Sequence, residues 1–300
     1  MKEKRVCFFI CIFFHFIFIF SAITYKGYEV ILKKSVESKN AFISYVSINK
    51  LPYIIKQKRI RSKVIVSVLR EALAAYIAQD LNIAHSVEII SMKDNFPGKL
   101  HKNLSATLHT IAPGKMVRDI QGKYSQLCIK QRCPKITNRW FDEIIVDHIT
   151  WHKDLPVIVA LDIFLCNTDR HKGNLFYDEI RDSFCAIDMD NIYRRNLSLY
   201  ACDNLEKMIK DKKKFTAKEI EALKVVKNTM EFLLQKYSSG DLVTLLYIFA
   251  HQAGYIDNGS VDNNRIKKRI DLYEQIIIES HVTAYKFVKM LDKVINHVYM

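Results

Sequence analysis

Acidic and amide side chains between residues 167 and 190 have the spacing that phosphoryl transfer requires. Asp169 is followed five residues later by Asn174, and Asp188 lies fourteen residues further on. Phosphoryl transfer needs one carboxylate to accept the proton of the attacking hydroxyl, and it needs an amide and a second carboxylate to hold magnesium on the nucleotide phosphates. The sequence therefore predicts that Asp169 is a catalytic base and that Asn174 and Asp188 are metal ligands.

The segment from Asp162 to Asn174, with Ile187-Asp188 downstream, resembles the active-site segment of the HipA-like and phosphatidylinositol 3-/4-kinase-like branch of the protein-kinase-like superfamily. That branch has the order Asp-Arg-His and then Asn, whereas ordinary protein kinases have His-Arg-Asp with the Asn again five residues after the Asp. The resemblance implies a two-lobed α+β fold with a small β-rich N-lobe and a mainly helical C-lobe, and it implies ATP and Mg²⁺ as cofactors.

The resemblance also assigns Arg170 and His171 to the catalytic loop. It implies that both support the loop and that His171 lies near the transferred phosphate. On chemistry alone, a histidine beside a carboxylate can itself be a general base, but we prefer Asp169 in that role. Asp162 lies about two helical turns before Asp169 and is expected to brace the loop.

An apolar helix and two short strands are predicted to position this loop. The helix covers residues 155–166, and the strands cover 174–177 and 184–187. If these strands are paired, Asn174 and Asp188 lie next to each other.

A plainer alternative is that residues 167–169 form only a turn that ends the helix and that residues 188–191 form a solvated loop. Asn and Asp favour such turns because their side chains bond to nearby backbone groups. The apolar residues on both sides of each segment favour a position beside the core instead.

A nucleotide-binding lysine and a glutamate that pairs with it are expected upstream. Residues 41–57 alternate around a central turn and predict a hairpin whose second strand carries Lys56. The next segment has apolar residues at helical spacing up to about Asp80, and it contains Glu71. We expect Lys56 to contact the phosphates and Glu71 to pair with it. The alternative is that Lys56 belongs to a basic surface run and that Glu71 is an ordinary partner of Arg70.

The loop at residues 33–40 would cover the phosphates, but it contains no glycine. The branch that this chain resembles also departs from the glycine-rich pattern. An equal alternative is that this segment is a solvated hairpin tip. A strand is predicted from residue 106 to a Pro-Gly turn at 113–114, and the backbone near Leu108 and Thr110 is expected to hold the adenine ring. A helix is predicted from residue 115.

The rest of the chain is predicted to be helical, and no linker divides it. We therefore expect a leader at 1–24, an N-lobe at 25–115 and a C-lobe at 116–300 that contains the catalytic and metal-binding loops. The predicted C-terminal helices cover 218–236, 242–250 and 266–298.

The first 24 residues are predicted to be a signal peptide or a membrane anchor. A basic start at 2–5 precedes an almost unbroken apolar run from Val6 to Ala22. Its length lies between a secretory apolar region of about 7–15 residues and a full span of about 20. The protein is therefore expected to be secreted, as a host-delivered effector that meets ATP inside a cell, or to be anchored through this segment.

The chain is strongly basic, with a net charge of +14 at pH 7. Such a charge favours anionic membranes, acidic proteins or nucleic acids without selecting among them, and no nucleic-acid motif is present. Cysteine pairs do not complete a zinc pattern, so the cysteines are expected to be buried or free thiols.

The predicted activity is transfer of the γ-phosphoryl group of ATP to a hydroxyl of a protein Ser/Thr or a phosphoinositide. One alternative is a pseudokinase or an AMP-transferring enzyme of the same fold. Another is a basic module that binds membrane surfaces without catalysis.

Overall fold

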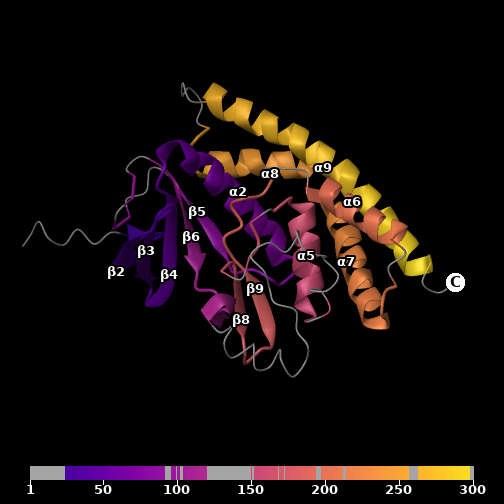
Figure 1. Ribbon diagram of the computed structural model, residues 1–300. Coiled ribbons are helices and arrows are strands. Elements are labelled where there is room, and N and C mark those ends of the chain that lie inside the picture. Colours follow the sequence, from indigo (N-terminus) through magenta and orange to yellow (C-terminus); the bar gives the residue numbers. More distant parts are fainter. Residues whose placement is uncertain are drawn as a thin grey trace, which may run out of the picture.

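The computed structural model describes residues 24–91, 96–98, 100–101, 104–119, 150, 152–167, 169–171, 173–193, 197–211, 214–256 and 263–297. Figure 1 shows an N-terminal sheet on one side of the molecule and a group of long helices on the other. The predicted α+β class, with a β-rich N-terminal region and a helical C-terminal region, is confirmed. The predicted leader lies almost wholly outside the described residues, which begin at Thr24.

The N-terminal sheet has six strands in the order β1-β2-β3-β4-β6-β5, and every neighbouring pair is antiparallel. The predicted hairpin is present, and it turns at Asn49 and Lys50, which both have positive φ. Asn tolerates this conformation better than most residues. The strands are β1 (Thr24–Tyr25), β2 (Tyr28–Glu37), β3 (Ala41–Ile48), β4 (Leu51–Lys58), β5 (Val87–Ile90) and β6 (Ala106–Thr110).

Side chains of β4 alternate between the two faces of this sheet, as the pleat requires. Ile55 is fully buried in a small apolar cluster with Val46 and Leu108. Lys56, the next residue, points to the opposite face, where it contacts helix α2 (Arg61–Gln79). The sheet thereby buries an apolar core on one face and presents a lysine on the other.

Helix α2 joins the sheet to the helical region. Seven apolar residues of α2 belong to the main apolar core, together with residues of helix α5 (Asp154–Phe164): Leu69, Ala72, Leu73, Ala74, Ala75, Ile77 and Ala78. Because α2 is fixed in this core, the sheet that packs on it is held next to the helices (Figure 1).

A second sheet of three strands lies below the first in Figure 1. It contains β7 (Lys115–Met116), β8 (Leu175–Asp178) and β9 (Ser183–Ala186), all antiparallel. The predicted helix from residue 115 is wrong at its start, because Lys115 and Met116 pair with Tyr177 and Phe176. The two strands predicted between Asn174 and Asp188 are confirmed to within one residue.

Helices form the rest of the described chain, close to the predicted ranges. Thr216 and Ser238 each begin a helix with a reciprocal capping box. The long α9 runs across the other helices in Figure 1. These helices are α6 (Leu197–Lys210), α7 (Ala217–Lys236), α8 (Ser239–Gln252) and α9 (Asn263–His297).

Within the described residues, no helix combines the length and apolar character needed to cross a membrane. Cys166, Cys185 and Cys202 are buried free thiols, as predicted for the cysteines of this region.

Candidate active site

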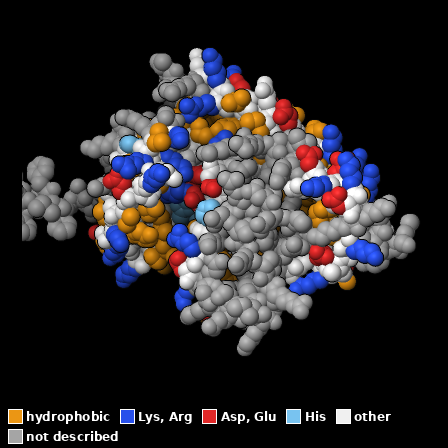
Figure 2. Space-filling view, in the orientation of Figure 1, with side chains coloured by type: hydrophobic (Ala, Val, Ile, Leu, Met, Phe, Trp, Pro, Cys, Tyr) orange, Lys and Arg blue, Asp and Glu red, His pale blue; other side chains and the backbone are white. Residues whose placement is uncertain are grey.

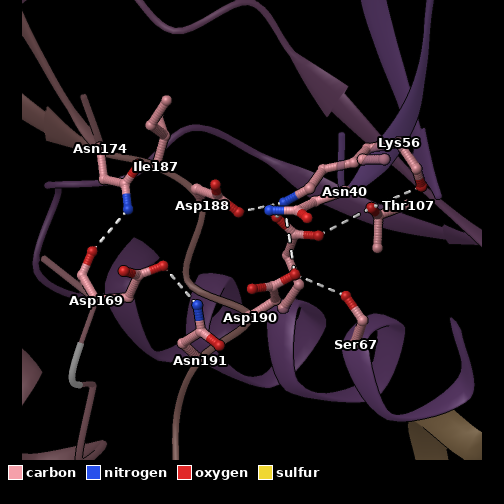
Figure 3. Close-up of polar contacts among 12 residues, drawn as sticks. Asn40, Lys56, Ser67, Thr107, Asp169, Asn174, Ile187, Asp188, Asp190 and Asn191 are labelled. Atoms are coloured by element: carbon pink, nitrogen blue, oxygen red, sulfur yellow. Dashed lines mark hydrogen bonds and ion pairs between the residues drawn. The ribbon is translucent and has the colours of Figure 1, made fainter. Parts of the chain in front are cut away.

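Lys56 is the centre of a network that joins β4, α2 and the loop after β9. Its Nζ lies 2.8 Å from Glu71 Oε1 on α2 and also contacts Asp188 Oδ1. Asp190 Oδ2 lies 3.8 Å from the same nitrogen. Figure 3 shows Lys56 reaching from the sheet toward Asp188 and Asp190. The structure therefore brings together the lysine, the glutamate and one metal ligand that the sequence predicted.

The charges of this network shift the pKa values of its members. Burial alone would lower the pKa of Lys56, but the negative charges of Glu71, Asp188 and Asp190 raise it well above its usual value. The positive charge of Lys56 lowers the pKa of Asp188 to about 2, although burial opposes this shift. Both groups are therefore charged at neutral pH, and the Asp188 side chain is still 39 % exposed. An ionised, accessible carboxylate is suited to binding a hard cation.

Glu71 is held by the sheet as well as by Lys56. Thr107 Oγ1 donates to Glu71 Oε2 at 3.1 Å, and His109 Nε2 lies 2.8 Å from Thr107 Oγ1. His85 Nε2 lies 2.8 Å from His109 Nδ1 and extends this chain of polar side chains. Thr107 and His109 were not predicted from the sequence. Because side chains alternate along a strand, both lie on the face of the sheet that also carries Lys56.

The two histidines are neutral in this network. Burial, supported by the charge of Lys56, lowers the pKa of His109 to about 3. Burial and the neighbouring His109 lower the pKa of His85 to about 4. One neutral ring therefore donates an N–H hydrogen bond to the other, and neither ring carries a positive charge that would compete with Lys56 for Glu71.

The predicted catalytic loop rests on a buried arginine. Arg170 is 2 % exposed, and its Nε and Nη2 each donate to a carboxylate oxygen of Asp162 at 2.9 Å. Its Nη1 donates to the backbone oxygens of Asn174 and Ile187, at 2.8 and 3.0 Å. The resemblance assigns Arg170 to the catalytic loop as a support, and all of these contacts hold backbone and side chains in place. It is therefore a positioning residue, and Asp162 braces the loop through it.

Asp169 and Asn174 are oriented by neighbouring groups. Asn191 Nδ2 donates to Asp169 Oδ2 at 2.5 Å, and Asn174 Nδ2 donates to the backbone oxygen of Asp169 at 2.7 Å. Ile187 N donates to Asn174 O at 3.1 Å, so Asn174 and Asp188 come from adjacent strand ends, as predicted. Figure 3 shows both with Asp169 around one open region.

His171 is tied to its own loop. Its Nδ1 accepts a hydrogen bond from Gly173 N at 2.9 Å, so the ring carries its proton on Nε2 when it is neutral. A Cβ on Gly173 would lie only 2.8 Å from His171 Cε1, so a larger residue there would displace the His171 ring. The arrangement favours a supporting role for His171.

Strand pairing limits which backbone groups can serve the position predicted for the adenine ring. Leu108 lies in the middle of β6, between β4 and β5, and its backbone groups are used in strand pairing. Thr110 N donates to Ser86 O, and its Oγ1 accepts from Ser86 N, both at 3.0 Å. The linker at residues 111–114 follows Thr110 and lies outside the strand pairing of this sheet.

Asp190 also belongs to the candidate site. The plainer alternative in the sequence analysis placed it in a solvated loop at residues 188–191. It is 2 % exposed, and its Oδ2 accepts from Ser67 Oγ at 2.8 Å and contacts Lys58 Nζ. Met189 and Ile192 are buried on either side of it. The solvated-loop alternative is therefore wrong. The two-residue spacing of Lys56 and Lys58, and of Asp188 and Asp190, was the available signal.

The residues present fit a magnesium ion that is shared with a nucleotide. Magnesium is usually held by one or two carboxylates together with waters and substrate phosphates. Asp188 supplies a carboxylate, and Asn174 supplies an amide oxygen because its nitrogen is used on Asp169. Among the described residues, no group of three or more His, Cys, Asp or Glu side chains could hold a metal. A site completed by phosphates needs no such group.

The α+β arrangement and this constellation of side chains are consistent with a kinase-like fold. No family model matches the chain, and no curated protein matches it. Among solved structures it is similar to the Helicobacter pylori proinflammatory kinase CtkA, at 12 % identity and a TM-score of 0.49, over 85 % of this chain and 96 % of that one. These comparisons do not select the HipA-like or the phosphatidylinositol 3-/4-kinase-like branch.

Proposed function

We propose that this protein is a kinase that transfers the γ-phosphoryl group of ATP to a hydroxyl group of a protein Ser/Thr or a phosphoinositide. The observation that carries the proposal is the contact of Lys56 with both Glu71 and Asp188. A buried lysine between a helix glutamate and a partly exposed carboxylate is the arrangement that phosphoryl transfer uses to hold nucleotide phosphates.

In this proposal the nucleotide lies against the N-terminal sheet. Lys56 binds phosphate oxygens, and the linker at 111–114 takes the adenine contact first assigned to Leu108 and Thr110. Glu71 keeps Lys56 extended, and Thr107 keeps Glu71 in place. When bound by Asp188 and Asn174, Mg²⁺ would neutralise charge on the phosphates.

Asp169 is proposed to accept the proton of the attacking hydroxyl. Asn191 holds one of its carboxylate oxygens, and this contact leaves the other for the acceptor. Arg170 fixes the backbone on both sides of the site through Asn174 and Ile187. The chemistry then consists mainly of positioning and charge stabilisation, which dominate phosphoryl transfer.

The substrate and the location of the protein are parts of the same proposal. A host-delivered protein would meet ATP and protein acceptors inside a cell, whereas an anchored one would meet phosphoinositides and anionic lipid directly. The basic charge of the chain supports contact with anionic membranes, and Figure 2 shows Lys and Arg side chains at many places on the described surface.

The test follows labelled ATP with the full chain kept in detergent micelles. With γ-labelled ATP, magnesium, protein acceptors and mixed phosphoinositide vesicles, label should appear on one acceptor class. Asp169→Asn and Asp188→Asn should reduce it at least 100-fold, since each removes a group that acts on the reacting atoms. Asp211→Asn, at an exposed position, is the matched control.

Other outcomes select the alternatives. Transfer of label from α-labelled but not γ-labelled ATP would identify an AMP-transferring enzyme. Magnesium-dependent nucleotide binding without transfer would identify a pseudokinase. Vesicle binding that needs neither magnesium nor nucleotide, and that Asp188→Asn leaves unchanged, would identify a membrane-surface module and refute the kinase proposal.

A further inference from the structure

A cavity of about 510 Å³ lies beside the candidate active site. It is lined by residues of β4, of α2 and of the first half of α9. Asp190 forms part of its wall, and Ser67 also lines it. Figure 3 shows Asp190 and Ser67 in contact, between the loop after β9 and α2. Lys56 and Asp188, which we propose hold the nucleotide and its metal, do not line this cavity.

The cavity has a strong excess of positive charge. Lys58, Lys63, Arg70 and Arg269 come from three different elements and line the same space, against the single acidic residue Asp190. Basic side chains that converge from separate elements are a suitable site for phosphate groups, because they surround the anion rather than form one surface face.

One of these cations is buried. Arg70 is 8 % exposed, and its guanidinium carbon lies 4.6 Å from the centre of the Tyr273 ring. This stacking joins α2 to α9 and fixes the direction of the guanidinium group. Arginines are rarely so buried, because removing the charge from water is costly.

Asp190 requires a hydrogen-bond donor from the ligand, whereas the basic side chains require negative charge. Its Oδ2 is engaged by Ser67 and Lys58, but its buried Oδ1 has no hydrogen-bond partner in the part of the chain that the structure describes. A buried acceptor without a donor is costly. A ligand for this cavity should therefore carry a hydroxyl or another donor as well as negative charge.

The size of the cavity fits a small molecule rather than a single ion. Sites for such molecules usually measure about 300–1,000 Å³. We propose that this cavity binds a phosphorylated polyol, with its phosphate groups against the four basic side chains and one hydroxyl donating to Asp190 Oδ1. The proposal goes beyond phosphoryl transfer and holds whether or not the protein is a kinase.

Calorimetry on the full chain in detergent micelles, without nucleotide or magnesium, tests this site. The probe is inositol trisphosphate. The comparison compounds are inositol, inorganic phosphate and butane-1,4-diol bisphosphate, which has two phosphates and no hydroxyl. We expect saturable 1:1 binding of the trisphosphate. Affinity should be at least fivefold lower for the diol bisphosphate and at least tenfold lower for inositol and for inorganic phosphate.

Charge reversal on the cavity wall provides the second arm. Lys63→Glu and Arg269→Glu should each weaken binding at least tenfold. Lys268→Glu makes the same change at an exposed position next to Arg269 that does not line the cavity, and it should weaken binding less than twofold. The urea midpoint of each variant shows whether its fold is intact.

Vesicles that carry a phosphorylated inositol lipid separate the two sources of this chemistry. Competition between vesicles and the soluble probe, with the same variant pattern, would identify a lipid headgroup, and binding of the soluble probe alone would identify a free polyol phosphate. Equal losses in Lys268→Glu and Arg269→Glu would overturn the proposal, as would inorganic phosphate binding as tightly as the trisphosphate. Equal affinity for the diol bisphosphate would refute the contact with Asp190.

Discussion

Arg170 and Asp162 form a two-point ion pair inside the protein, with both nitrogen-to-oxygen distances at 2.9 Å. Neither side chain is more than 2 % exposed. The pair links the helix before the catalytic loop to the backbone after Asn174 and after Ile187. The geometry of the loop therefore depends on the buried Arg170–Asp162 pair.

Replacing this arginine by lysine should both destabilise the fold and disorder the site. Arg170→Lys keeps the charge but cannot make the two-point contact, so we expect a loss of about 3–5 kcal/mol in the free energy of unfolding. Urea denaturation measures it. The matched control is Arg59→Lys, because Arg59 forms an exposed pair with Glu37 at 2.9 Å. That change should cost less than about 1 kcal/mol. Equal losses would show that the buried pair has no special role.

Glu71→Gln should lower nucleotide affinity without lowering the stability of the sheet. It removes one of the charges that hold Lys56, so we expect kcat/KM to fall about 100-fold, with most of the change in nucleotide affinity. The control is Glu88→Gln, which breaks the exposed pair of Glu88 with Lys26 and should leave activity unchanged. Fluorescence titration with a nucleotide analogue checks both. Unchanged affinity in Glu71→Gln would contradict the role given to this pair.

The histidine pair predicts that stability falls in mild acid. The folded-state pKa values, about 3 for His109 and about 4 for His85, lie below the unfolded value of 6.5, so below pH 6.5 the unfolded chain binds more protons. The stability that comes from neutral rings is complete above pH 6.5 and is lost as the pH falls toward 4. Each ring contributes a slope of about 1.4 kcal/mol per pH unit in that range.

Urea midpoints between pH 7.5 and 4.5 measure this slope. His109→Gln should flatten the curve, whereas His251→Gln, at an exposed position, should leave it unchanged. A curve of the same steepness in His109→Gln would show that other groups cause the acid sensitivity.

Two glycines with nearly the same positive φ should lose different amounts of unfolding free energy when they are replaced by alanine. Gly114 has φ of +83°, and a Cβ there would lie 2.0 Å from Tyr177 O, whereas Gly27 has φ of +81° and nothing within 4 Å. Gly27→Ala should cost only the backbone strain, about 1–2 kcal/mol. Gly114→Ala should cost about 1–3 kcal/mol more, because the linker must move away from β8. Thermal unfolding compares them, and equal losses would exclude steric contact as the cause.

Much of the fold was predictable from local patterns. The alternation of residues 41–57 and the helical spacing in α7 depend on neighbouring residues, and both predicted elements are present. The start of β7 was not predictable, because Lys115 and Met116 become a strand only by pairing with residues about sixty positions later. Non-local pairing overrides a weak local preference.

The candidate site likewise contains residues that local sequence patterns predict and residues whose role depends on distant parts of the chain. The spacing of Asp169, Asn174 and Asp188 was sufficient to nominate them. Asp190 was missed because its burial depends on Ser67 and Lys58, which lie more than 120 residues earlier. The adenine contact was placed on Leu108 because fold order gives a strand but not which of its backbone groups remain unused in a sheet.

Helix α9 contacts parts of the molecule that are far apart. Tyr273 stacks on Arg70 of α2, Ser280 accepts a hydrogen bond from Cys166 just before the catalytic loop, and Asp292 pairs with Lys227 of α7. With 35 residues, the helix is about 50 Å long. A stiff rod fixed at several points transmits displacement along its length. Any swing of α2 and its sheet away from the helices must therefore either carry α9 along, and disturb the base of the catalytic loop, or pull Arg70 off its ring.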